Sequence, residues 1–349
     1  MKFRPLADTG VFVSELCLGT MTFGSSAQIW EVIGGLDQAA ADAIVHRALD
    51  AGINFIDTAD VYSAGESEEI VAKAIKGRRD DVVLATKVHG AMGADPNMSG
   101  SSRRWILREC EESLRRLDTD YIDLYQIHRP RPDTDIDETL GALSDLVHQG
   151  KVRYIGSSTF PASAIVEAQW VAERRNRERF VCEQPPYSML VRGIEYDVLP
   201  TCEKYGIGVI PWSPLAGGWL SGKWRKGADD LTSHRANRIP ARYDLSLPGN
   251  QRKLDAADAL AALADEAGLS LVHLAVAWVL NNRAVTSAII GPRTMEQLTT
   301  QIGAADVVLD ADLLDRIDDI VPPGTVFNPA DAGYQPPMVA DPKWRRRVG

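Results

Sequence analysis

The chain has 349 residues, of which 45% are hydrophobic and 25% are charged, which is ordinary usage for a globular protein. Its formal net charge of −10 at pH 7 makes nucleic acid and anionic membranes poor partners. The N-terminus lacks the long apolar region of a signal peptide, and no uncharged apolar run reaches the ~18 residues of a membrane span. We therefore expect a cytoplasmic protein.

The four cysteines lie in apolar segments and show neither disulfide nor metal-ligand spacing. We interpret Cys17, Cys110, Cys182 and Cys202 as small core residues. Nothing in the spacing of the histidines marks a metal site either, so no metal is expected.

A turn signal at 8–10 lies between the short alternating segments 3–6 and 11–14, which predicts an N-terminal β-hairpin. Apolar runs then alternate with stretches of helical periodicity. We expect strands at 15–19, 53–56, 82–86, 121–127, 152–157, 180–184, 207–212 and 285–290. We expect helices at 39–51, 66–76, 102–116, 136–149, 160–175, 194–204, 250–267, 270–281, 294–303 and 310–320.

The eight predicted strands are continuous apolar runs, as burial on both faces of a sheet requires. Alternating strands and helices give a doubly wound sheet or a closed barrel, and eight units favour a (β/α)8 TIM barrel. The first loop, 19–24, lacks the G-x-G-x-x-G pattern of a Rossmann sheet. We expect one domain over 1–349, with long loops at the C-terminal face, among them 217–249, and an irregular tail at 322–349.

Polar side chains occur where three successive strands end. Asp57 and Tyr62 follow the second strand, Lys87 ends the third and His128 ends the fourth. Active sites of such barrels are built at the C-terminal ends of the strands. An ammonium beside a phenol lowers the phenol's pKa, so Lys87 is expected to activate Tyr62 while Asp57 keeps Lys87 charged. The four groups together suit protonation of an oxyanion that develops at a carbonyl.

The chain resembles an aldo-keto reductase over essentially its whole length. The resemblance is carried by LGTMTFG at 18–24, NFIDTADVY at 54–62, TK at 86–87, QIH at 126–128, GKVRYIGSS at 150–158, PWSPL at 211–215 and IIG at 289–291. It implies a barrel that binds NADP(H) without a Rossmann domain and transfers hydride from the nicotinamide to a carbonyl carbon. It also implies that Tyr62 is the general acid, that Lys87 and Asp57 tune it, and that His128 orients the carbonyl.

The resemblance further implies a cofactor site along the strand ends. Ser157, Ser158 and Gln184 would hold the nicotinamide carboxamide, although the family more often has Asn at position 158. Trp212 would stack on the nicotinamide ring. The other implied cofactor contacts are Gly19, Thr20, Ser213, Pro214, Leu215, Gly217, Leu220, Gly291, Gln297 and Gln301, where the family more often has Asn at position 301.

Arg293 opens the helix that follows the eighth strand. A helix N-terminus attracts phosphate, and a guanidinium suits a 2′-phosphate, so NADPH is expected in preference to NADH. Substrate contacts are expected from the loops above the strand ends, at Phe23, Trp30, His89 and Trp219.

The expected function is NADPH-dependent reduction of an aldehyde or ketone, with a small-molecule carbonyl compound as the partner. Two alternatives stay open. One is a nucleotide-binding regulatory subunit with the same fold, and the other is a biosynthetic reductase of a keto sugar or polyketide. A barrel hydrolase or lyase is disfavoured because the metal ligands or paired carboxylates that it needs are not apparent. Neither the natural substrate nor the oligomeric state follows from the sequence.

Overall fold

The computed structural model describes residues 1–25, 35–228, 231, 234–237 and 239–347. Eight parallel strands form one sheet in the order β10-β3-β4-β5-β6-β7-β8-β9. The strands are β3 (Leu16–Gly19), β4 (Phe55–Asp57), β5 (Val83–Val88), β6 (Ile122–Ile127), β7 (Val152–Ser157), β8 (Phe180–Glu183), β9 (Gly208–Val209) and β10 (Ala288–Ile290). Each of them lies at a predicted strand.

Hydrogen bonds join the two ends of this sheet. The amide of Thr286 donates to the carbonyl of Val209 at 2.7 Å, and the amide of Ile289 donates to the carbonyl of Pro211 at 2.9 Å. Isolated parallel bridges pair Val209 with Val285 and Trp212 with Ile289. The strands therefore close into the predicted (β/α)8 barrel.

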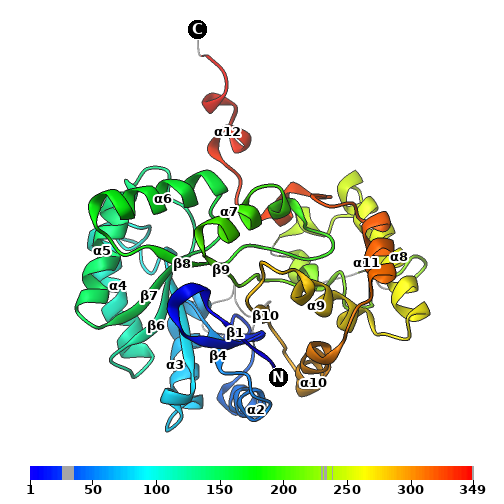
Figure 1. The fold of residues 1–349 in the computed structure, drawn as a ribbon, viewed down its shortest axis with the longest axis horizontal. Helices are drawn as coiled ribbons and strands as arrows, with labels where there is room; N and C mark the ends of the chain where they lie inside the picture. The colour runs from blue at the N-terminus through cyan, green and yellow to red at the C-terminus, as the bar shows by residue number, and fades with distance from the viewer. Residues whose placement is uncertain (26–34, 229–230, 232–233, 238, 348–349) are drawn as a thin grey trace.

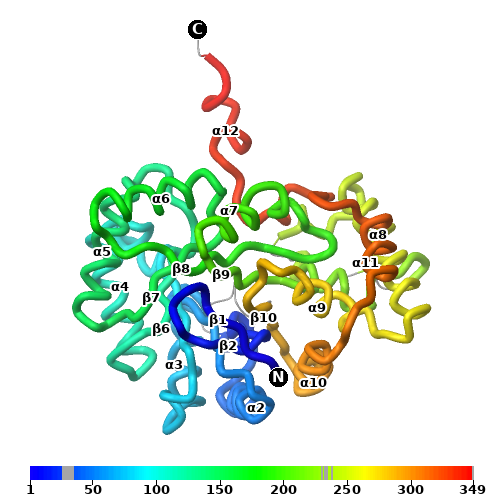
Figure 2. Tube along the Cα trace, viewed as in Figure 1, coloured from blue at the N-terminus to red at the C-terminus, as the bar shows by residue number. Residues whose placement is uncertain are grey.

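Helices surround the strands in Figures 1 and 2. They are α2 (Gln38–Asp50), α3 (Glu66–Ala74), α4 (Arg103–Arg116), α5 (Ile136–His148), α6 (Ala162–Arg175), α7 (Val198–Tyr205), α8 (Pro248–Glu266), α9 (Leu271–Asn281), α10 (Met295–Gly303), α11 (Ala311–Ile320) and the short α12 (Pro337–Ala340). In the part of the chain that the structure describes, no single helix has the length and hydropathy to cross a bilayer. Helices α8 and α9 reach that threshold only as a pair bent by 96°.

The predicted hairpin is present as β1 (Phe3–Pro5) and β2 (Phe12–Ser14), which pair antiparallel. Leu6 and Val13 belong to the same buried cluster as interior side chains of the barrel. These interior residues are Cys17, Phe55, Ala85, Leu124, Cys182, Ile210 and Ile289. The hairpin thus packs against an apolar layer inside the barrel.

The strand period places a polar layer two residues further along the same strands. Side chains at i and i+2 of a strand share a face. Adding two to the interior positions gives Gly19, Asp57, Lys87, Gln126, Gln184, Trp212 and Gly291. Gly19 leaves room in this layer, because a Cβ there would lie 2.6 Å from Cγ2 of Ile289. One apolar layer therefore supports a polar layer at the ends of the strands.

The long loop after β9 and the C-terminal tail are fastened together by buried charges. Asp331 is 2% exposed and accepts from Nε of Arg242 at 2.5 Å and from Nζ of Lys253 at 2.7 Å. Arg242 lies in the long loop and Lys253 in α8. Beyond this cluster the tail forms short turns, and α12 projects away from the barrel (Figure 1).

Candidate active site

Lys87 of β5 is at the centre of the predicted catalytic group, and its side chain is fully buried. Its ammonium donates to Oδ2 of Asp57 at 2.6 Å, to the carbonyl of Thr58 at 2.8 Å and to the hydroxyl of Tyr62 at 3.4 Å. An ammonium has three N–H donors, so each has an acceptor here. The structure therefore brings Asp57, Lys87 and Tyr62 into direct contact, although they come from different loops and strands.

The second oxygen of Asp57 is held by two amides. Oδ1 accepts from Nε2 of Gln126 at 3.1 Å and from Nε2 of Gln184 at 2.8 Å. Gln184 also donates to Oε1 of Gln126 at 3.1 Å. Sequence reasoning gave Gln126 no role, although it lies in the motif that ends with His128. These bonds hold the Asp57 carboxylate in one orientation toward Lys87.

The pKa values of Lys87 and Tyr62 each reflect a balance between burial and nearby charges. Burial by itself lowers the pKa of Lys87, but Asp57 and Tyr62 outweigh it, so the pKa is raised and the ammonium stays charged. Burial raises the pKa of Tyr62 above its usual value, and Lys87 only partly opposes this. Lys87 lowers the pKa of Tyr62, as expected, but burial has the larger effect, so the net shift is upward. Tyr62 is a protonated phenol at neutral pH.

His128 stands beside the phenol, after β6. The ring centroids of Tyr62 and His128 are 5.8 Å apart in an edge-to-face arrangement. Burial, together with the charges of Arg129 and Lys87, lowers the pKa of His128 well below its usual value. The imidazole is thus neutral at neutral pH and keeps one N–H that it can donate.

The two serines at the end of β7 point in opposite directions. Ser158 lies two positions beyond Gly156 on the interior face, and its hydroxyl donates to the carbonyl of Gln184 at 2.8 Å. Ser157 lies on the other face and donates to the carboxyl of Glu183 instead. Of the two, Ser158 is the one that the structure brings to Gln184 at the polar layer.

Thr159, which sequence reasoning passed over, stands next to Ser158. Its hydroxyl lies 3.3 Å from that of Ser158, and its backbone adopts a left-handed φ of 61°. A Cβ on Gly333 would lie 2.9 Å from Cζ2 of Trp212 and 3.0 Å from Cγ2 of Thr159. The tail therefore crosses directly against Trp212 and Thr159 at the end of the barrel.

The segment after Trp212 forms a tight turn. Ser213 has a φ of 64°, and its hydroxyl accepts from the amide of Gly217 at 3.0 Å. The hydroxyl of Tyr243 donates to the carbonyl of Gly217 at 2.9 Å. A side chain at position 217 would collide with that hydroxyl, since a Cβ would lie 2.7 Å from it. Pro214, Leu215 and Leu220 belong to the same turn and its continuation, and Leu220 is buried.

The start of α10 has the features of an anion site. Thr294 caps the helix by accepting from the amide of Gln297, and the side chain of Gln297 accepts from the amide of Arg293 at 2.8 Å. The guanidinium of Arg293 is close enough to Arg235 of the long loop to lower the pKa of Arg235, after the larger effect of burial. Sequence reasoning gave Arg235 no site role. A helix N-terminus with two guanidinium groups nearby favours phosphate.

Two buried polar atoms near these groups have no hydrogen-bond partner among the described residues. They are Oε1 of Gln301 in α10 and Nε1 of Trp212. Gln301 is 5% exposed, and an acceptor at that position fits the amino group of an adenine. The donors at the strand ends, the cationic helix start and the unpaired Gln301 oxygen thus fit an extended dinucleotide. Gly291 follows β10 and lies directly before this segment.

Thr20 has its hydroxyl occupied inside the protein, 2.9 Å from the hydroxyl of Ser67. Among the expected substrate residues, Phe23 is fully buried. Trp219 is 1% exposed and stacks on Trp224 with ring centroids 3.9 Å apart. These contacts give Phe23 and Trp219 packing roles, and their place in a substrate pocket stays a prediction. Trp30 lies outside the described residues.

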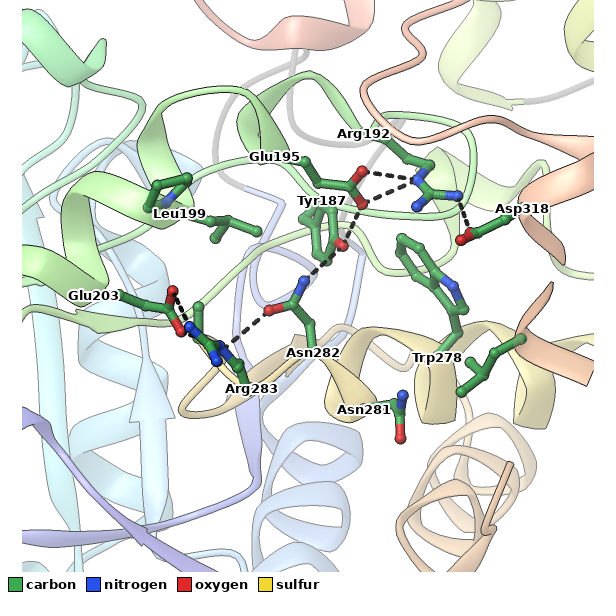
Figure 3. A pocket seen from close by; sticks show the side chains of 13 residues that line it. Tyr187, Arg192, Glu195, Leu199, Glu203, Trp278, Asn281, Asn282, Arg283 and Asp318 are labelled. Carbon is green, nitrogen blue, oxygen red and sulfur yellow. Dashed lines mark hydrogen bonds and ion pairs between the residues drawn. The ribbon is translucent and has the colours of Figure 1, made fainter. Parts of the chain in front are cut away.

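A cavity of about 520 Å³ opens elsewhere, between α7, α9 and α11. None of the four predicted catalytic residues lines it. In Figure 3 its polar side chains pair with one another, and Tyr187 donates to Glu195 while Arg192 bonds both Glu195 and Asp318. These bonds tie the β8–α7 loop to α11.

The model of the aldo/keto reductase family matches residues 15–322. The chain belongs to the aldo/keto reductase family. An uncharacterized oxidoreductase of Bacillus subtilis, YrpG, is 42% identical over 92% of this chain and 96% of its own length. The aldo-keto reductase YhdN of the same organism is 37% identical over 85% and 87%.

One further relative is named as a channel subunit rather than as an oxidoreductase. A probable voltage-gated potassium channel subunit beta of Arabidopsis thaliana is 36% identical over 92% of this chain and 97% of its own length. Membership of the aldo/keto reductase family therefore makes this chain an oxidoreductase by family, while its substrate stays open.

Proposed function

We propose that this chain reduces an aldehyde or ketone to an alcohol, with NADPH as hydride donor and Tyr62 as proton donor. The observation that carries the proposal is the buried contact of Asp57, Lys87 and Tyr62, with the neutral His128 beside it. The hydroxyl of Tyr62, which Lys87 holds, and the N–H of His128 can both face one oxygen atom. This is the arrangement that a carbonyl becoming an alkoxide requires.

Each residue has a separate task in this mechanism. His128 donates a hydrogen bond that orients the carbonyl oxygen and polarises its bond to carbon. Tyr62 gives its proton to that oxygen as negative charge develops, and Lys87 stabilises the phenolate that is left. Asp57 keeps Lys87 charged, and Gln126 and Gln184 keep Asp57 in place. When bound, the reduced nicotinamide supplies the hydride.

The residues that would hold NADPH extend from the polar layer to the start of α10. Ser158, Thr159 and Gln184 would hold the carboxamide, and Trp212 would lie against the face of the ring. Backbone donors of the turn at 213–217 suit the pyrophosphate. Arg293 and Arg235 suit a 2′-phosphate, which is why we favour NADPH over NADH.

The test is NADPH oxidation, followed at 340 nm, with a panel of aliphatic and aromatic aldehydes and ketones, and repeated with NADH. We expect turnover of several members of the panel and a lower KM for NADPH than for NADH. Arg293→Ala should raise the dissociation constant for NADPH by about tenfold, since one charge-assisted contact is lost, and should leave that for NADH nearly unchanged. Equal losses for both cofactors would contradict the role of Arg293.

The second candidate is a regulatory subunit, and the similarity to named channel β-subunits favours it. A chain of this kind would bind NADPH, which a change in NADPH fluorescence would show. It would not oxidise the bound NADPH with any carbonyl compound of the panel. A keto-sugar or polyketide reductase would instead show turnover confined to those substrates. The same panel therefore separates the three readings.

A further inference from the structure

Arg129 follows His128 in the sequence, and no role has yet been given to it. Its guanidinium is half-buried at the mouth of the barrel. One of its nitrogens, Nη1, donates to the carbonyl of His128 at 2.5 Å and lies 3.4 Å from the hydroxyl of Ser158. The guanidinium carbon is 5.9 Å from the centre of the Trp212 ring. Arg129 thus stands among catalytic and cofactor-side residues at once.

The charge of Arg129 has no directly paired carboxylate among the described residues, and Glu183 attracts it only from a greater distance. Throughout the described ranges, no carboxylate lies within ion-pairing distance of it, whereas Arg131, two residues on, is paired with Asp133 at 2.7 Å. Burial lowers the pKa of Arg129, although the guanidinium remains charged at neutral pH. Keeping an unpaired charge half out of water is costly, and an incoming anion would relieve that cost.

The free edge of the guanidinium has the geometry of a carboxylate receptor. The hydrogen bonds of Arg129 to the described residues all use Nη1, so the Nε–Nη2 edge is available. That edge presents two parallel N–H donors, which match the two oxygens of a carboxylate.

A second unsatisfied group lies near Arg129. Nδ1 of His89 is buried and has no hydrogen-bond partner in the described part of the chain. Burial, helped by the nearby charges of Arg131 and Arg129, lowers the pKa of His89 to about 4, so its imidazole is neutral and can serve a polar ligand. His89 follows Lys87 by two residues and so leaves the barrel on the same side as the catalytic group.

We propose that Arg129 binds a carboxylate of the substrate, so that this enzyme prefers carbonyl compounds that carry an acidic group, with His89 as a further polar contact. This inference rests on the proposed function, because it concerns the substrate of the same site.

The test compares matched pairs of aldehydes that differ only in charge. 4-Carboxybenzaldehyde is measured against its methyl ester, and 4-oxobutanoate against its methyl ester, with wild type, Arg129→Gln and the control Arg131→Gln. In the wild type we expect kcat/KM to be higher for the acids. Arg129→Gln should lower the acid-to-ester ratio by roughly 10- to 100-fold, mainly through KM of the acids, while Arg131→Gln should change it less than threefold.

Two further measurements keep the outcome unambiguous. Arg129→Lys should restore part of the acid-to-ester ratio of kcat/KM, because lysine has the positive charge but lacks the two parallel N–H donors of the guanidinium. Calorimetric binding of benzoate to the NADP⁺-saturated protein should weaken in Arg129→Gln and not in Arg131→Gln. This arm also applies if no aldehyde is reduced, so failure of the proposed function is distinguishable from failure of the carboxylate site.

An unchanged acid-to-ester ratio in Arg129→Gln, with benzoate binding also unchanged, would overturn the inference. So would a variant that loses NADPH affinity and turns over acids and esters equally poorly, because Arg129 would then serve the cofactor.

Discussion

The Lys87–Asp57 pair inside the barrel and the Lys253–Asp331 pair beneath the tail are nearly the same length, 2.6 Å and 2.7 Å, and both are buried. Their surroundings differ. Asp57 meets one cation and two amide donors, whereas Asp331 meets two cations, Arg242 and Lys253. Asp57 and Tyr62 raise the pKa of Lys87 over the opposing effect of burial, while burial prevails in lowering the pKa of Lys253.

This difference distinguishes a pair that we propose to be catalytic from a pair that anchors the tail. Lys87 has a third contact, to the phenol of Tyr62, which is the contact that the proposed mechanism uses. Lys253 instead bonds the carbonyl of Arg242 at 2.8 Å and lies 4.4 Å from the centre of the Trp219 ring. In the proposed mechanism the first pair sets the state of the proton donor, whereas the second fastens the tail to the long loop.

The largest effect is expected from Lys87→Met. It removes the cation that holds Tyr62 and leaves Asp57 buried without a compensating charge. We expect turnover to fall by about 10³-fold and the free energy of unfolding to fall by about 3–5 kcal/mol. Steady-state NADPH oxidation and urea unfolding measure the two effects. Turnover within tenfold of wild type would contradict the role given to Lys87.

Asp331→Ala should act on stability first. It leaves the charges of Arg242 and Lys253 buried without their carboxylate, and we expect a loss of about 3–5 kcal/mol in the free energy of unfolding. Limited proteolysis should then cleave the tail after residue 322 sooner than in the wild type. A variant as stable as the wild type, with its tail equally protected, would show that the cluster does not anchor this segment.

Glu183 sharpens the comparison because it is a buried carboxyl that bonds Ser157 and the amide of Phe160 rather than a cation. Burial raises its pKa from 4.5 to about 7, against these hydrogen bonds. Between those two pH values the unfolded chain loses a proton that the folded chain keeps. The contribution of Glu183 to the free energy of unfolding should therefore be largest below pH 4.5. It should fall by about 3 kcal/mol as the pH rises from 4.5 through 7.

Glu183→Gln should flatten this part of the pH profile. The measurement is the urea midpoint at half-unit steps from pH 4.5 to 8, in the wild type and the variant. The comparison is of slopes, because the amide also changes the hydrogen bond from Ser157. Parallel slopes in the two proteins would mean that Glu183 is not the titrating group.

The smallest effect is expected from Lys253→Met. Asp331 keeps its bond to Arg242, and a methionine retains most of the packing against Trp219, so a loss of about 1 kcal/mol is expected. Turnover should stay within a factor of three. A loss as large as that from Lys87→Met would remove the distinction between the two pairs.

The sequence was sufficient to predict the barrel and the gathering of Asp57, Tyr62, Lys87 and His128 at its strand ends, because both follow from strand period and strand ends. The catalytic roles of these four residues stay a prediction. Asp57, Lys87 and Gln184 are each two residues beyond an interior apolar position, and parallel strands bring such positions to one layer. The same period explains Ser157, which lies on the opposite face from Ser158. A count of two from Gly156 would have singled out Ser158.

What the sequence could not supply depends on distant partners. Asp331 is separated by 89 residues from Arg242 and by 78 from Lys253, and nothing in the local pattern of the tail marks a buried carboxylate. The net rise in the pKa of Tyr62 was also beyond reach, because it depends on how completely the folded chain buries the phenol. Arg129 was visible next to His128, but only the fold shows that no carboxylate of the described residues forms an ion pair with it.

The central claim is that Tyr62, held by Lys87, gives the proton to the substrate oxygen. The direct measurement is single-turnover oxidation of bound NADPH by Tyr62→Phe with saturating aldehyde, alongside the dissociation constant for NADPH. The account predicts a rate lower by 10²- to 10⁴-fold, with the dissociation constant within threefold of wild type. A single-turnover rate equal to that of the wild type would contradict it.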